Sequence, residues 1–200
     1  YTYSNNPVDD GGANPLMYIP KSKDELTFLD IKRGVNSKGE TVTYSGEGNP
    51  GDQVIYTAAQ QAEDFWNFLN QDDYLSKHKG EYAERNAAIM PWHHQFDFKF
   101  MQNFYLNIGK QRNTLQFGID IMNVGNLLCN KWGLYKQTTT NATSPLKVAT
   151  DLEGKLVNNN GMRAFNMNKD GSQTLTKTFK DYQGFGSTYS IQFSVRYIFN

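Results

Sequence analysis

The fold is decided by one stretch near the C-terminus, Tyr189-Ser190-Ile191-Gln192-Phe193-Ser194-Val195-Arg196-Tyr197-Ile198-Phe199. Its apolar side chains stand at every second position, and Ser, Gln and Arg alternate with them over most of its length. Successive side chains of a β-strand point to opposite faces of a sheet, so we expect a strand with one apolar and one polar face. Its length matches the roughly 9–11 residues with which a tilted strand crosses a bilayer.

Two earlier stretches alternate in the same way, and a short polar connection joins them. Aromatic rings stand at every second position in residues 92–100, with His94 among them, and apolar side chains do so again in residues 115–121. Residues 109–113 are polar and begin with a glycine, which is typical of a hairpin turn. The three strands are expected at about 92–107, 114–124 and 188–199. The apolar side chains expected to share one face are Phe96, Phe98, Phe100, Phe117, Ile119, Phe193, Val195 and Tyr197. The polar side chains expected on the other face are His93, Gln95, Asp97, Lys99, Gln192, Ser194 and Arg196.

The composition favours an all-β class and argues against several kinds of protein. Aromatic residues make up 14% of the chain, which suits strands better than a helical bundle. The 20 basic residues balance the 20 acidic ones, so no general attraction to nucleic acid is expected. The single Cys129 excludes an internal disulfide, and no apolar run has the length of a transmembrane helix. A mean hydropathy of −0.67 remains compatible with a transmembrane β-barrel, because alternating strands average out as polar.

Residues 1–91 are expected to be mostly loop, with one helix. Turn-forming clusters such as Asn14-Pro15 and residues 46–51 interrupt short apolar stretches. Apolar side chains at three- and four-residue spacing, with Thr57 as the N-cap, predict a helix near residues 58–70. Such a helix either packs a loop onto a larger body or binds a partner, and the first role is the more common.

The alternating strands fit two kinds of β-protein. In a soluble sandwich or barrel the apolar face points inward, whereas in an outer-membrane barrel it meets lipid and the polar face lines a wet lumen. Alternation alone does not choose between them. The strand length, the short turn opposite very long loops and the terminal position of the last strand favour the membrane barrel. Residues 145–165 are then either another pair of barrel strands or a hairpin within a loop.

Four stretches of the sequence are similar to motifs of one protein family, and they occur in the same order as in that family. Residues 74–86 and 91–97 are similar to an RG-x-Y-x-x-RN … PW-x-x-x-x-D signature, and residues 117–128 to a strand followed by N-L-F/L. Trp132-Gly133-Leu134-Tyr135 follows at the usual interval, and residues 191–200 are similar to a closing β-strand. In these stretches the chain resembles the C-terminal part of a TonB-dependent outer-membrane transporter, of the Oar-like branch related to the SusC-type importers. Asn200 after Phe199 departs from the family's usual terminal aromatic residue.

This resemblance implies a fold, a location and partners. It implies the C-terminal strands of a transmembrane antiparallel β-barrel, with long extracellular loops, in the outer membrane of a Gram-negative cell. Residues 1–91 and about 125–186 would lie outside the cell, and the turn at 109–113 in the periplasm. The implied role is non-enzymatic import of a nutrient, such as a glycan or a peptide, with the lipid bilayer and the barrel-assembly machinery as partners. A TonB-type energy-coupling protein would act through a plug domain, but the sequence contains no plug domain, no TonB box and too few strands to close a barrel.

Few residues stand at the spacings that are typical of metal-binding or catalytic motifs, so no catalytic, cofactor or metal site is expected. His93 and His94 are adjacent, and adjacent side chains of a strand cannot bind one metal ion together. Asp10-Gly11-Gly12 and Asp170-Gly171-Ser172 look like pieces of calcium loops but lack the ligand spacing. The alternative function is a soluble cell-surface or periplasmic β-domain that binds glycan or protein. A third hypothesis, a secreted hydrolase, would use the loop carboxylates Asp72, Asp73, Glu81 and Glu84.

Overall fold

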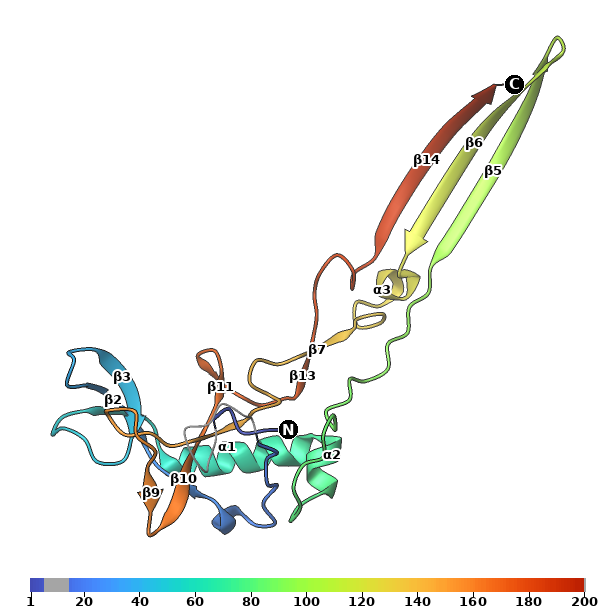
Figure 1. Ribbon diagram of the computed structural model, residues 1–200. Helices are drawn as coiled ribbons and strands as arrows, with labels where there is room; N and C mark the ends of the chain where they lie inside the picture. Colours follow the sequence, from blue (N-terminus) through green and yellow to red (C-terminus); the bar gives the residue numbers. More distant parts are fainter. Residues whose placement is uncertain (6–14, 200) are drawn as a thin grey trace. The chain divides into compact units, whose positions relative to one another are not determined.

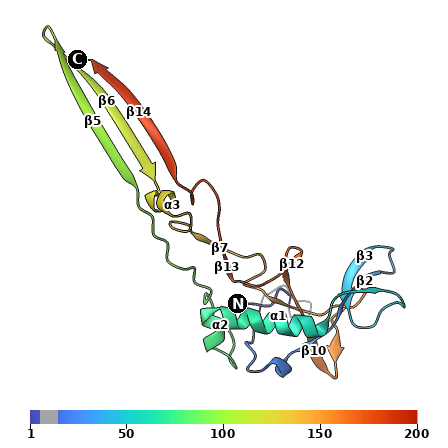
Figure 2. The same cartoon turned by 180° about the vertical axis from the view of Figure 1, so that it is seen from behind.

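The alternation, capping and turn signals of the sequence produce a β-rich chain with few helices, shown as a computed structural model in Figures 1 and 2. The structure describes residues 1–5 and 15–199, so the Asp10-Gly11-Gly12 stretch lies outside the described residues.

The chain forms two units, and each unit is built from two separate stretches of the sequence. The first unit comprises residues 1–89 and 138–179, and the second comprises residues 90–137 and the chain from 180 onward. We expected a single boundary near residue 91. Residues 138–179 instead belong with the first unit, because their strands pair with a strand near the N-terminus.

Helix α1 (Ala58–Gln71) lies at the centre of the first unit and confirms the helix expected near residues 58–70. Thr57 and Gln60 form a capping box, in which each side chain accepts a hydrogen bond of 3.2 Å from the other residue's backbone N–H. The buried apolar side chains of α1 are Phe65, Phe68 and Leu69. They pack in a core with Leu146 and Met167.

Strand β10 (Met162–Met167) organises the sheet that packs against α1. Strand β1 (Thr27–Phe28) pairs with β10 in parallel, whereas β8 (Leu146–Val148) and β9 (Asn158–Asn159) pair with it antiparallel. Residues 145–165, for which a barrel strand pair and a loop hairpin were both open, thus contribute to the sheet of the first unit.

A buried amide joins α1 to this sheet. The Gln61 side chain is fully buried, and its Nε2 donates to the carbonyl oxygen of Leu29 at 2.7 Å. Its Oε1 accepts from the backbone N–H of Met167 at 3.0 Å. One side chain therefore holds the helix, the end of β10 and the segment after β1 together.

The remaining elements are short. The first unit also contains η1 (Lys23–Glu25), α2 (Asp73–Lys77), a sheet ordered β3 (Thr41–Ser45), β2 (Ile31–Val35), β4 (Gln53–Tyr56), and the pair β11 (Lys169–Asp170) and β12 (Gln173–Thr174). Strand β7 (Lys136–Thr138) pairs with β13 (Phe179–Asp181) where the chain passes between the units. Next to this pair, the backbone N–H of Thr139 donates to the carbonyl oxygen of Thr178 at 2.9 Å.

The second unit contains the long strands β5 (Phe98–Ile108), β6 (Gln111–Met122) and β14 (Ser190–Phe199). They form an antiparallel sheet ordered β14-β6-β5 and run side by side in both views (Figures 1 and 2). A turn of only two residues joins β5 to β6, and Gly109 occupies its first position with φ +64°. A positive φ at this position is typical of a type II′ hairpin turn and favours glycine.

The first strand is shorter than expected. We expected it to begin near residue 92, but β5 begins at Phe98, because residues 92–97 have no strand beside them to pair with. The carbonyl of Phe96 and the carboxylate of Asp97 accept hydrogen bonds from the backbone of residues 123–124 instead.

No sheet formed by the described residues closes into a barrel. Within residues 1–5 and 15–199, no helix is long and apolar enough to cross a membrane.

Candidate functional site: a two-faced sheet and its polar junction

The register of the three long strands places their apolar side chains in rows. Phe100 pairs with Ile119, which pairs in turn with Phe193, and directly paired residues share one face of a sheet. The side chains on this face, called the apolar face below, are Phe98, Phe100, Gln102, Phe104, Leu106, Ile108, Gln111, Asn113, Leu115, Phe117, Ile119, Ile121, Ile191, Phe193, Val195, Tyr197 and Phe199. Its three amides are Gln102 and, near the hairpin turn, Gln111 and Asn113. Phe104 and Phe117 are in edge-to-face contact, with ring centroids 5.8 Å apart.

No described part of the chain covers the apolar face. Phe193 is 74% exposed, Val195 66% and Phe100 50%, although these side chains are large and apolar. Scattered exposed apolar residues are common in proteins, but a continuous apolar patch across three strands is typical of a surface that contacts a protein, a membrane or a ligand.

The opposite face, called the polar face below, carries hydrogen bonds and charges. Lys99 pairs directly with Asp120, and its Nζ lies 3.2 Å from Oδ1 of that carboxylate. The Nε2 of Gln116 donates to Oδ1 of Asn103 at 2.9 Å. The residues on this face are Lys99, Met101, Asn103, Tyr105, Asn107, Arg112, Thr114, Gln116, Gly118, Asp120, Met122, Ser190, Gln192, Ser194, Arg196 and Ile198. Most of them are compatible with a water-filled space.

Both outer strands of the sheet lack a partner on one side among the described residues. Strand β6 is paired along both edges, whereas β5 and β14 are paired only with β6. An edge of 10 or 11 residues presents a row of unpaired backbone N–H and C=O groups. Such edges are a template on which further strands add.

Asn123 connects three segments at the end of the sheet away from the hairpin turn. It is 1% exposed and has φ +54°, a left-handed conformation that asparagine tolerates. Its Nδ2 donates to the carbonyl oxygens of Gly133 at 2.9 Å and Ser187 at 3.0 Å. Its backbone N–H donates to Oδ1 of Asp97 at 2.8 Å, which lowers the pKa of that carboxyl group. The residues before β5, after β6 and before β14 are thus fixed to one another.

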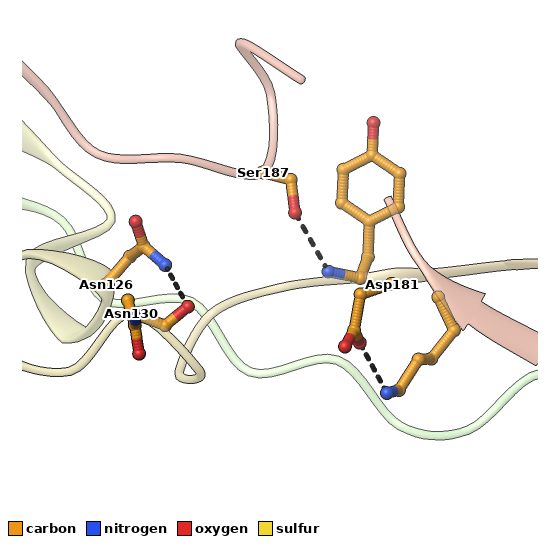
Figure 3. Close-up of polar contacts among 6 residues, drawn as sticks. Asn126, Asn130, Asp181 and Ser187 are labelled. Atoms are coloured by element: carbon orange, nitrogen blue, oxygen red, sulfur yellow. Dashed lines mark hydrogen bonds and ion pairs between the residues drawn. The ribbon is translucent and has the colours of Figure 1, made fainter. Parts of the chain in front are cut away.

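Asn126, in the short helix α3 (Val124–Leu128), extends this junction. Its Nδ2 donates to the carbonyl oxygens of Asn130 at 3.2 Å and Trp132 at 3.0 Å, and its Oδ1 accepts from the backbone N–H of Tyr189 at 3.2 Å. Figure 3 shows the Asn126 side chain directed at the Asn130 backbone.

The segment leading to β14 is fixed in the same region. Figure 3 also shows the Ser187 hydroxyl, whose Oγ accepts from the backbone N–H of Tyr135 at 3.2 Å. The carboxylate of Asp181 forms an ion pair with Lys136. We refer to Asp97, Asn123, Asn126 and Ser187 together as the polar junction.

The structure assembles most, but not all, of the residues predicted for the two faces. Apart from Phe96, every residue of the predicted apolar set lies on the apolar face. On the polar side, Lys99, Gln192, Ser194 and Arg196 lie on the polar face as expected.

The other four predicted face residues, His93, Gln95, Phe96 and Asp97, precede β5 and belong to neither face. The imidazole Nε2 of His93 lies 3.2 Å from the carbonyl oxygen of Gly133. Gln95 donates to Asp97 at 3.0 Å. Residues 92–97 do alternate in sequence, but without a neighbouring strand the alternation creates no sheet face.

Apart from Asp97, the residues of the polar junction were not predicted from the sequence. Asn123 and Asn126 directly follow an apolar strand, but asparagine is common in turns, so their position alone does not distinguish a junction from a turn.

The loop carboxylate Asp72 lies in a hydrogen-bond network of the first unit. Asp72 is buried, accepts hydrogen bonds from the hydroxyls of Tyr1 and Thr178, and caps α2 through the N–H groups of Tyr74 and Leu75. Among the described residues, no three His, Cys, Asp or Glu side chains are arranged to hold a metal ion.

No protein-family model, curated protein or solved structure matches the chain.

Proposed function

We propose that β5, β6 and β14 are strands of a transmembrane antiparallel β-barrel in the outer membrane of a Gram-negative cell. We also propose that the chain is the C-terminal part of a TonB-dependent transporter that imports a nutrient. The observation that carries the membrane assignment is the uncovered apolar face, which is continuous across three strands and lies opposite a polar face.

The lengths of the strands support this proposal. They contain 11, 12 and 10 residues, and roughly 9–11 are needed to cross the hydrocarbon core at the usual tilt. In a barrel, the apolar face contacts lipid, and the polar face, with Lys99, Asp120 and Arg196, lines the lumen. The unpaired edges of β5 and β14 are satisfied by the neighbouring strands of the same barrel, since a closed sheet has no edge.

The connections at the two ends of the sheet differ in the way that is typical of such barrels. The β5–β6 turn has two residues, whereas residues 123–189 separate β6 from β14. Outer-membrane barrels have short periplasmic turns and long extracellular loops. On this basis Gly109 lies on the periplasmic side, and the polar junction lies on the outer side.

Assignment to a nutrient importer rests on the family resemblance of residues 74–97, 117–135 and 191–200. In that family the barrel and its loops bind substrate outside the cell, and a TonB-type protein acts on the plug. The chain's own contribution is then the lumen-facing residues and the long outer loops, with no enzymatic step. A glycan or a peptide is the class of nutrient that we propose.

Two lysine substitutions on opposite faces test the membrane assignment. Phe193 lies on the apolar face and Gln192 on the polar face, where it pairs with Asp120. Phe193→Lys should cost about 2–4 kcal/mol if this side chain meets the membrane midplane, so little protein should be recovered in the outer-membrane fraction. Gln192→Lys is the matched control and should insert normally. Equal recovery of the two variants would rule out the assignment of faces.

The alternative function is a soluble cell-surface or periplasmic β-domain that binds glycan or protein. The observation in its favour is the first unit, which has a buried core of its own built on Phe65, Phe68 and Leu146. The two proposals differ in what they predict for the purified protein. The membrane barrel requires detergent to stay in solution, whereas the soluble domain stays monodisperse in plain buffer.

A further inference from the structure

A cleft of about 840 Å³ lies within the first unit. Its lining comes from residues within 28–32, from Gly46 and Glu47 after β3, from the first residue of α1, and from residues within 151–159, which include β9. All of these residues belong to the first unit, so the cleft is formed by one compact part of the chain. Its volume is within the range that is typical of ligand-binding clefts.

The cleft offers aliphatic surface but little aromatic surface. Its apolar lining residues are Phe28, Leu29, Ala58, Leu156 and Val157. Phe28 is the only aromatic residue in the lining, and it is 8% exposed because its ring packs against Phe65, with centroids 5.8 Å apart. The lining therefore has no open aromatic ring on which a sugar ring could stack. Its aliphatic surface suits an alkyl chain instead.

Three carboxylates, those of Asp30, Glu47 and Asp151, line the cleft, which we call the acidic cleft. Oδ1 of Asp30 accepts a hydrogen bond from the backbone N–H of Ala58 at 2.6 Å. Oδ1 of Asp151 accepts from two backbone N–H groups within the next four residues, at 2.9 and 2.8 Å. Within residues 1–5 and 15–199, no hydrogen bond or ion pair engages Oδ2 of either aspartate or the exposed carboxylate of Glu47. The backbone thus fixes two carboxylates and leaves one oxygen of each for a ligand.

The positive charge in the lining does not neutralise these carboxylates. Lys32 is the single basic residue of the lining, and its Nζ donates to the carbonyl oxygen of Gly46 at 2.9 Å. Arg163 donates to Oδ1 of the lining residue Asn158 at 3.0 Å but is not itself part of the lining. Three carboxylates and one ammonium group leave an excess of two negative charges in the lining. Charge complementarity therefore favours a cationic ligand.

We propose that the acidic cleft binds a lysine or arginine side chain of a peptide. The alkyl part of that side chain lies on the aliphatic surface, and its cationic end lies at the carboxylates of Asp30, Glu47 and Asp151. A long basic side chain combines these two properties, whereas a neutral glycan has no charge for the carboxylates and finds no aromatic ring to stack on. This inference rests on the proposed importer, whose outer loops include the first unit, and it names basic peptides as the class of nutrient.

Isothermal titration calorimetry on the full chain in detergent tests this inference. The probes are an acetylated and amidated pentapeptide of three alanines and two lysines, the same peptide with glutamine in place of lysine, and the neutral glycan maltohexaose. Each probe is titrated into the unsubstituted protein, into Glu47→Gln and into Glu84→Gln. Glu84 is an exposed residue of the same unit outside the cleft, so the two variants lose the same charge at different places. Neither carboxylate forms an ion pair within the described residues, so both variants should fold.

We expect the lysine peptide to bind more tightly than the glutamine peptide. Glu47→Gln should weaken binding of the lysine peptide about two- to fivefold, the effect of one partly exposed ion pair, and Glu84→Gln should leave it unchanged. Equal affinities for the two peptides, or equal effects of the two variants, would overturn the inference, and so would maltohexaose binding that Glu47→Gln weakens. All three outcomes leave the membrane barrel standing. The barrel itself is wrong if the protein stays monodisperse without detergent, whether or not the cleft binds the lysine peptide.

Discussion

Gly133 shows how much of the polar junction depends on a single residue. It has φ +65°, and a Cβ at this position would lie 1.8 Å from Oδ1 of Asn123, the side chain that also binds the Gly133 carbonyl. Any larger residue must therefore adopt an unfavourable backbone conformation and displace the central amide of the junction. A substitution at Gly133 therefore has two independent energetic costs, one from the backbone conformation and one from the displaced Asn123 amide.

Gly133→Ala should accordingly destabilise the second unit more than Gly109→Ala does. Gly109 also has a positive φ, but a methyl group added there would have no atom within 4 Å, so only the conformational cost of roughly 1–2 kcal/mol applies. At Gly133 the loss of buried hydrogen bonds adds about 1–3 kcal/mol. Urea unfolding of the two variants in detergent gives the comparison, and equal midpoints would show that Asn123 does not hold the junction.

Tyr44 provides a residue-scale prediction for the first unit. Its hydroxyl donates to Oδ2 of Asp52 at 2.6 Å, and this bond, together with burial, raises the pKa of Tyr44 to about 12 from an ordinary value of 10.0. The folded state favours the neutral hydroxyl, so the stabilisation is complete below pH 10 and is lost as the pH rises toward about 12.

Asp52→Asn removes the negative charge and should move one tyrosine to a lower pKa. Tyrosinate absorbance measured through an alkaline titration will then rise earlier than in the unsubstituted protein, by the amplitude of a single tyrosine. Asp73→Asn, at an exposed position, should leave the titration curve unchanged. Identical curves for all three proteins would contradict the assigned bond.

At the scale of elements, Gln61 couples α1 to β10. A leucine in its place fills a similar volume but leaves the N–H of Met167 without its acceptor, whereas the Leu29 carbonyl keeps Nδ2 of Asn166 as a donor. A buried group without a partner costs about 1–3 kcal/mol, so Gln61→Leu should lower the free energy of unfolding of the first unit by about that amount. Asn67→Leu, on the exposed side of the same helix, should change it little. Thermal unfolding followed by circular dichroism compares the two, and similar losses would contradict a coupling role for Gln61.

The sequence predicts those elements whose signals are local. Helix α1 has both periodic apolar residues and a capping pair, β6 alternates from Leu115 to Ile121, and β14 alternates from Ser190 to Tyr197. Residues 92–97 alternate equally well, yet form no strand, because pairing depends on a neighbour that the local pattern does not contain. The polar junction was missed for a related reason: its hydrogen bonds join Asn123 to Ser187, far apart in the chain.

At the scale of the whole molecule, the stretches that form the first unit alternate along the sequence with those that form the second. The first unit needs residues 138–179 because β1 has only two residues and pairs with β10, more than a hundred positions later. So short a strand carries no recognisable sequence pattern, which is why a single boundary near residue 91 was expected. Long-range pairing, rather than local propensity, decides which unit residues 138–179 join.

The hydrogen bond between Thr139 and Thr178 has a consequence for the order of folding. Before the first unit forms, β14 must find β6 across the free chain of residues 123–189, and the entropy lost in closing a loop increases with the logarithm of its length. Once Thr139 and Thr178 are side by side, only the two short connections flanking them remain to be closed. Folding of the first unit thus shortens the length of free chain across which β14 must find its partner strand β6. A substitution that slows the folding of this unit will therefore delay the pairing of β14, although it touches neither strand.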